Sequence, residues 1–229
     1  MITSTSKSFE TVLENLKGEN KLFLVGCGDC ATICKTGDED TVKAMKAKLE
    51  ENGKTVTGWI VVTPACNVGK LRKEFKAVKQ QIDDSDSILV MSCGLCVAAV
   101  IDAVEQVKPV HPGTDTGFGG ETIRFGQFTE RCSMCGECIL EDTGGICPVT
   151  MCSKGLLNGP CGGYKNGKCE VDPELDCGWM MIYERLGKLN KLDKMEPLRK
   201  PKNFAKWKRP RKLVLTDEQK FGKKKTTNE

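Results

Sequence analysis

The 229-residue sequence contains one histidine, His111. Serine and cysteine hydrolases use histidine as a base, and most zinc hydrolases use several as ligands, so this scarcity argues against those reaction classes. The sequence also lacks a run of 18 apolar residues, which a membrane-spanning helix would need. Its first residues, MITSTSKSFETVLENLK, lack the apolar segment and cleavage site of a secretory signal. We therefore expect a cytoplasmic protein with no membrane span.

Cysteine, by contrast, is abundant, with 14 in the chain. A reducing compartment disfavours a set of structural disulfides, and apolar packing would account for one or two cysteines only. Metal–thiolate bonding is the explanation that remains. Because histidine is nearly absent, the sites must be almost entirely sulfur, which favours iron–sulfur clusters or zinc held by four cysteines.

The N-terminal half alternates between strand and helix patterns. Residues 8–16 predict a short amphipathic helix. The later strands are predicted at 21–26, 55–63 and 87–92, and the later helices at 38–52, 68–82 and 95–107. Val110 is expected to begin a fourth strand. This order predicts an α/β fold with a small parallel sheet of the Rossmann or flavodoxin-like kind.

Composition then divides the chain into three parts. Residues 1–131 are predicted to form the α/β domain, including a Gly- and Thr-rich linker at 108–131 that packs on it. Residues 132–197 are predicted to form a cysteine-rich domain closed by a helix at 176–189. Because this domain is poor in apolar residues, metal is expected to stabilise it. Residues 198–229 form a basic, extended tail, whereas the rest of the chain is mildly acidic.

The cysteines of the first domain follow its strands. They are Cys27, Cys30, Cys34, Cys66, Cys93 and Cys96. The carboxyl ends of parallel strands share one sheet edge, so these residues should converge there. A [4Fe–4S] cluster needs four thiolates, which leaves two spare. Two alternatives stay open: small buried residues at strand ends, or a redox dithiol at Cys27/Cys30 or Cys93/Cys96.

The second domain opens with a CxxCxxC triplet, Cys132, Cys135 and Cys138, which suits three corners of one cluster. Cys147-Pro148 is similar to the Cys-Pro that closes a bacterial ferredoxin motif, although its distance from the triplet is longer. The later cysteines are Cys152, Cys161, Cys169 and Cys177. Eight thiolates can fill two four-ligand sites, and zinc is an open alternative to iron, especially for the later four.

A family resemblance rests on these residues. The segment CSMCGECILEDTGGICPVTMCSKGLLNGPCGGYKNGKCEVDPELDCGWMMIYERL (132–186) resembles the cysteine-rich module of the methylenetetrahydrofolate reductase C-terminal family. LRKPKNFAKWKRP (198–210) fits the continuation of that module. With the α/β domain ahead of it, the chain resembles the small iron–sulfur and zinc subunits of acetogen-type methylenetetrahydrofolate reductases.

The resemblance implies an accessory, non-catalytic subunit in one-carbon metabolism of the Wood–Ljungdahl type. It would carry two or three [4Fe–4S] clusters, with zinc possible at one cysteine site. Electrons would come from ferredoxin, flavodoxin or a larger redox complex and pass to FMN in a separate catalytic subunit. The chain itself has neither an eight-fold βα repeat nor a GxGxxG loop after a strand.

Two other functions stay open. One is a zinc-stabilised scaffold subunit of the same complex, with no redox role. The other is nucleic-acid binding through Trp207 and the basic residues of the tail, namely Lys206, Lys208, Arg209, Arg211, Lys212 and Lys223–Lys225. A solvated tail, or an arm anchored by Phe204 and Trp207 on an acidic partner, explains the same residues more simply.

Overall fold

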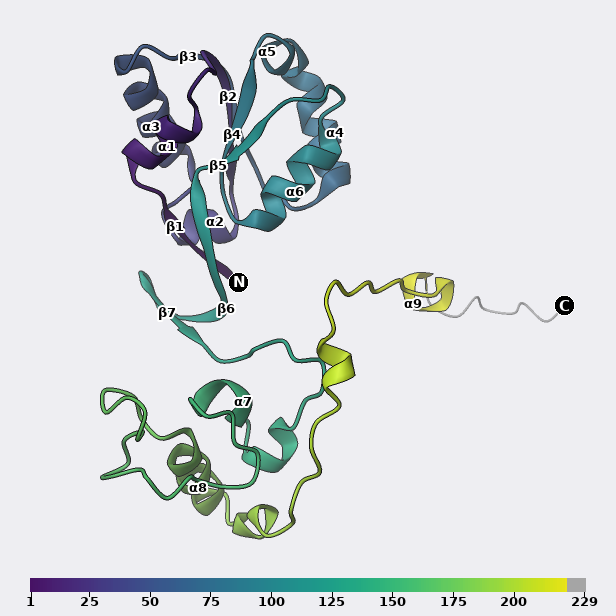
Figure 1. Cartoon of the computed structure of the whole chain (residues 1–229). Coiled ribbons are helices and arrows are strands. Elements are labelled where there is room, and N and C mark those ends of the chain that lie inside the picture. Colours follow the sequence, from purple (N-terminus) through teal and green to yellow (C-terminus); the bar gives the residue numbers. More distant parts are fainter. Residues whose placement is uncertain (222–229) are drawn as a thin grey trace, which may run out of the picture. The chain divides into compact units, whose positions relative to one another are not determined.

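The structure, a computed structural model, describes residues 1–221. The chain divides into two compact units, Met1–Ser133 and Met134–Glu229. The first unit layers helices on a sheet, and the second is built mostly of loops and short helices (Figure 1). The α/β class expected from the sequence is confirmed. Lys223–Lys225, which contribute to the nucleic-acid hypothesis, lie outside the described residues.

A four-stranded parallel sheet forms the centre of the first unit. Its strands are β2 (Lys21–Cys27), β3 (Thr55–Val62), β4 (Ser87–Met91) and β5 (Val110–Pro112). Their order is β3-β2-β4-β5. The chain therefore adds β3 on one side of β2 and then crosses to add β4 on the other. In open sheets of this kind, ligands bind where the strand order reverses, at the carboxyl ends of the two strands concerned.

Helices cover both faces of this sheet. On one face α1 (Phe9–Asn15) and α3 (Glu39–Glu51) pack against alternate residues of β2, including Leu22 and Leu24. On the other, α4 (Val68–Ala77), α5 (Lys79–Asp83) and α6 (Gly94–Ala103) pack against Phe23 and Val25. Burial on both faces explains why the strand is apolar at consecutive positions. The helix expected at 68–82 is interrupted at Val78, whose backbone leaves the helical region while its side chain packs on the core.

Residues 108–131 are not simply a linker. Here β6 (Thr114–Arg124) and β7 (Gln127–Glu130) form an antiparallel hairpin, and β1 (Ile2–Ser6) pairs with the other edge of β6. The hairpin turns at Phe125 and Gly126, and Gly126 supplies the positive φ of 77° that such a tight turn needs. The sequence analysis missed β1, so β6 had no expected partner.

The second unit contains α7 (Pro148–Met151), α8 (Gly178–Lys188) and α9 (Asp217–Phe221). Three short 3-10 helices lie at Leu140–Thr143 (η1), Leu192–Met195 (η2) and Phe204–Trp207 (η3). The helix predicted at 176–189 is present as α8. The unit's core is a small cluster of Cys177, Trp179, Ile182 and Leu186. Each such side chain contributes about 2 kcal/mol, whereas ordering one backbone residue costs about 1 kcal/mol, so this core alone is too small for the unit.

Within residues 1–221, no helix combines the length and the hydropathy needed to cross a membrane.

A substitution at Gly37 measures how tightly the backbone is packed at the carboxyl ends of β2 and β4. Its carbonyl accepts a hydrogen bond from the Cys27 N–H at 3.0 Å, and a Cβ added to it would lie 1.9 Å from the Met91 carbonyl oxygen. Gly37→Ala should therefore lower the free energy of unfolding of the N-terminal unit by about 2 kcal/mol, measured by chemical denaturation. Gly69→Ala is the control, because an added Cβ in α4 meets only an ordinary contact at 3.5 Å. Equal denaturation midpoints for the two variants would contradict this packing.

Candidate metal centre

Three cysteines of the first unit lie at the carboxyl ends of three neighbouring strands. Cys27 is the last residue of β2, Cys66 lies in the loop that follows β3, and Cys93 is the N-cap residue of α6, directly after β4. The order β3-β2-β4 therefore brings residues that are far apart in sequence to one edge of the sheet. This edge includes the point where the strand order reverses.

The Cys96 thiol is the centre of a group of interacting sulfurs. Its Sγ lies 4.0 Å from the Cys93 Sγ and accepts a hydrogen bond from the Ser92 hydroxyl at 3.0 Å. Hydrogen bonding with Cys96 lowers the pKa of Cys27 to about 5 and that of Cys93 to about 6. The same hydrogen bonds raise the pKa of Cys96, which keeps its proton. Two of the three thiols are thus readily available as thiolates, the form that binds metal.

Cys66 and Cys30 lie beside this group. Partial burial of its sulfur raises the pKa of Cys66, and the thiols of Cys27, Cys93 and Cys30 raise it further. The Cys30 sulfur accepts a hydrogen bond from the backbone N–H of Ile2 at 3.4 Å. Five of the six cysteines therefore gather at the sheet edge. Among the described residues, no contact links the sulfur of Cys34, the residue that ends α2 (Cys30–Ile33), to these thiols, so we do not count it in the group.

Threonines of β6 hold the loop that carries Cys93. The Thr114 hydroxyl donates to the Ser92 carbonyl at 2.6 Å, and the Thr116 hydroxyl accepts from the Gly94 N–H at 2.8 Å. The sequence analysis did not identify Ser92 or these threonines as part of the site. No local pattern could have done so, because the contacts depend on where β6 lies in the fold.

The triplet loop of the second domain has an unusual backbone. Met134 and Gly136 both have positive φ, 51° and 82°, so the chain curls between successive cysteines. Cys132 precedes the division between the units, and Cys135 and Cys138 follow it. Partial burial acts to raise the pKa of Cys135, but the backbone hydrogen bond with Glu137 and the ammonium of Lys202 outweigh burial and lower it.

Cys147 is the N-cap residue of α7, and its sulfur accepts a hydrogen bond from the Thr150 hydroxyl at 3.6 Å. The other four cysteines line one small pocket of about 20 Å³, which holds roughly one water-sized particle. They are Cys152, Cys161, Cys169 and Cys177. The last four cysteines of the chain are thus neighbours in space around one small pocket.

Glu170 and Ser153 also contact this pocket's thiols. The Cys161 thiol donates to the Glu170 carboxylate at 3.3 Å, and that carboxylate pairs with Lys154. The Cys169 sulfur lies 3.5 Å from the Ser153 hydroxyl, and this hydrogen bond lowers the pKa of Cys169. The sequence analysis named neither partner.

Residues 111–205 match the family described as methylene-tetrahydrofolate reductase C terminal. The match runs from β5 into η3 and includes all eight cysteines from Cys132 to Cys177. Comparisons with curated proteins and with solved structures found no match. The matched segment is therefore related to methylenetetrahydrofolate reductases, as the sequence resemblance indicated.

The sulfur atoms of both sets of cysteines, at the sheet edge and around the small pocket, suit metals that prefer sulfur ligands. Even so, no three His, Cys, Asp or Glu side chains in residues 1–221 already surround a single ion. At the sheet edge, hydrogen bonds between thiols hold the sulfurs together. The residues fit an all-sulfur site in chemistry and neighbourhood, and binding would replace these thiol protons with metal.

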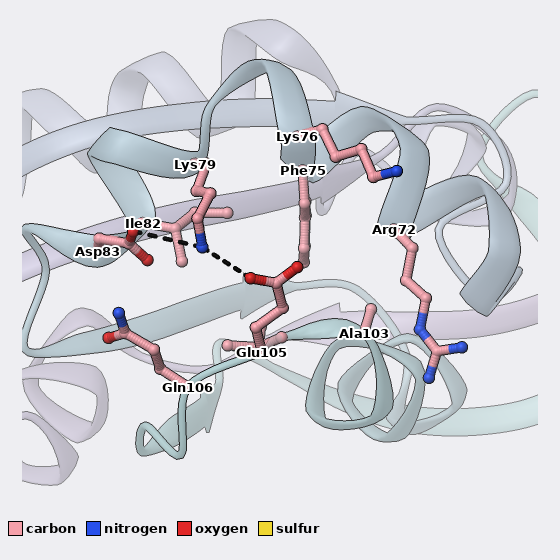
Figure 2. A pocket seen from close by; sticks show the side chains of 10 residues that line it. Arg72, Phe75, Lys76, Lys79, Ile82, Asp83, Ala103, Glu105 and Gln106 are labelled. Carbon is pink, nitrogen blue, oxygen red and sulfur yellow. Dashed lines mark hydrogen bonds and ion pairs between the residues drawn. The ribbon is translucent and has the colours of Figure 1, made fainter.

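A pocket of about 230 Å³ lies outside the family match and has no cysteine among its described lining residues (Figure 2). It lies between α4, α5 and the end of α6, so it is at the opposite edge of the sheet from Cys27. One of its two lysines, Lys79, is paired with Glu105 at 2.7 Å and Asp83 at 3.5 Å. These ion pairs engage both acidic side chains of the pocket.

Proposed function

We propose that this chain is the iron–sulfur electron-transfer subunit of a methylenetetrahydrofolate reductase. In this proposal it accepts electrons from ferredoxin, flavodoxin or a larger redox complex and passes them to FMN in a separate catalytic subunit. It is itself an accessory subunit that binds no folate, and its cytoplasmic location stays a prediction.

One observation carries the proposal: the family match spans every cysteine of the second domain. A reductase-related segment that concentrates sulfur ligands in this way is suited to hold redox metal rather than substrate. The thiols gathered around Cys96 in the first unit point to a further site of the same chemistry.

The first ligand assignment follows from which thiols are neighbours. Four of Cys27, Cys30, Cys66, Cys93 and Cys96 would hold one [4Fe–4S] cluster, which leaves Cys34 and one other cysteine spare. The second assignment follows from sequence spacing alone, and by it Cys132, Cys135, Cys138 and Cys147 would hold a second cluster. When bound, each cluster stores and releases single electrons. The protein's contribution is to position the thiolates and to set the charge around them.

The pocket of the last four cysteines favours zinc as a structural ion. Its lining brings four thiols together, and four thiolates form a closed tetrahedral zinc site. Since the apolar core of this unit is small, such an ion would help to order it. A chain that carried zinc alone would be the scaffold subunit of the alternative hypothesis.

Two of the basic residues named for nucleic-acid binding, Lys206 and Arg211, contact residues 134–137 of the same unit. Cations that are committed in this way are less available to a phosphate backbone. Lys208, Arg209 and Lys212 are exposed.

The proposal predicts iron and acid-labile sulfide in the chain after anaerobic purification, with a brown colour. Cys96→Ser should remove about four iron atoms per chain, because it removes the sulfur around which the first group is organised. Iron and sulfide assays together with visible absorbance measure this loss.

Cys34→Ser is the matched control, since Cys34 lies outside the group, and it should keep the iron of the wild type. Wild-type protein without sulfide, or equal iron loss in both variants, would contradict the assignment.

The zinc assignment predicts one zinc ion per chain. Cys169→Ser should remove it and destabilise the second unit strongly, because structural zinc contributes on the order of 10 kcal/mol to folding. Elemental analysis and thermal unfolding measure the two effects. If Cys169→Ser instead removed iron and left zinc in place, the pocket would hold a cluster and the zinc assignment would be wrong.

A further inference from the structure

The basic tail folds back on the triplet loop that carries Cys135. The Arg211 guanidinium donates to the Met134 carbonyl at 2.7 Å, and the Asn203 N–H donates to one Glu137 carboxylate oxygen at 2.7 Å. Lys206 pairs with the other Glu137 oxygen at 3.0 Å. Residues 202–211 therefore lie against 134–137 within one unit. The basic arm predicted from the sequence thus packs on a segment of its own chain.

Lys202 makes the contact that matters most. Its ammonium lies 3.1 Å from the Cys135 sulfur and also donates to the Glu137 carbonyl oxygen. Lys202 and Cys135 are both partly buried, so water screens this charge less than it would at the surface.

The nearby acidic side chain does not draw the Lys202 ammonium away from the Cys135 sulfur. Glu137 is the acid closest to it in the loop, and both oxygens of its carboxylate already have partners, the Asn203 N–H and the Lys206 ammonium. Those contacts, the Asn203 hydrogen bond first, lower the pKa of Glu137 and keep it ionised. Lys206 pairs directly with the Glu137 carboxylate, whereas the Lys202 charge acts on Glu137 without an ion pair and its ammonium contacts the Cys135 sulfur and a carbonyl oxygen.

We propose that Lys202 is a positioning residue that raises the reduction potential of the cluster bound through Cys135. The inference rests on the proposed function, which places a [4Fe–4S] cluster at the triplet loop. Reduction adds one electron to that cluster and breaks no bond, so the reduced state carries one more negative charge. A fixed ammonium and a hydrogen bond to a ligand sulfur favour that state.

The test is a reductive titration of the full-length chain with dithionite, followed by electron paramagnetic resonance. The signal of this loop is the one that Cys135→Ser removes. In Lys202→Met, which keeps the length of the side chain without its charge, the midpoint potential of that signal should shift to a more negative value. Lys202→Arg should stay near the wild type.

Lys200→Met is the matched control, because it removes an exposed charge from the same tail two residues earlier. Its midpoint potential should equal that of the wild type. If Lys202→Met purified without this cluster, Lys206→Met would serve instead. That variant frees the Glu137 charge beside the loop and should shift the potential in the same direction.

Different results would overturn the cluster at this loop and the role of Lys202. A wild-type chain in which Cys135→Ser removes no signal has no cluster at this loop, and that result would overturn the ligand assignment of the proposed function. If the signal is present and Lys202→Met has the same midpoint potential as the wild type, only the role of Lys202 is overturned. In that case the lysine is a structural clamp of the loop.

Discussion

The adjacency of β2 and β4 is the constraint on which the first thiol group depends. These strands are neighbours in the sheet, although α3, β3, α4 and α5 separate them in the chain. Their carboxyl ends carry Cys27 and Cys93, and Cys96 follows one turn into α6. The Cys96 thiol forms hydrogen bonds with both. The crossover of the chain therefore brings cysteines that are distant in sequence into one group. At the same end of these strands, the backbone of Gly37 packs closely against that of Met91.

The second unit depends on a different constraint. Its apolar core is small, its helices are short, and its cysteines are spread over loops. Such a chain gains order from bonds between loops, and metal–thiolate bonds are the strongest that these residues can make. The basic tail adds charge to the same unit, where Lys202, Lys206 and Arg211 contact the triplet loop. The charge of the tail therefore lies beside Cys135, a predicted metal ligand.

Much of the first unit could be predicted because its signals are local. The alternation of apolar runs with amphipathic helices predicted β2, β3, β4 and most helices within a few residues. The antiparallel sheet could not be predicted in the same way, because β6 becomes a strand through pairing with β1, more than a hundred positions away in sequence.

The same distinction applies to the sites. Spacing predicts the cysteines as ligands, since four or more sulfurs in a short span are a local pattern. Partners such as Ser92, Glu170 and Lys202 are brought to the sulfurs only by the fold. The grouping of the last four cysteines around one pocket likewise needed coordinates. The prediction of ligands thus rests on a local pattern in this sequence, whereas the hydrogen-bond and charge partners of the sulfurs depend on the fold.

The central claim is that this chain delivers electrons to a flavin on another subunit. The most direct measurement is anaerobic stopped-flow mixing of the reduced chain with the flavin-containing catalytic subunit. The account predicts that the visible absorbance of oxidised clusters returns as the flavin is bleached, with matching rates. A flavin that is reduced equally fast by the external carrier with this chain left out, or a chain that keeps its electrons on mixing, would contradict the account.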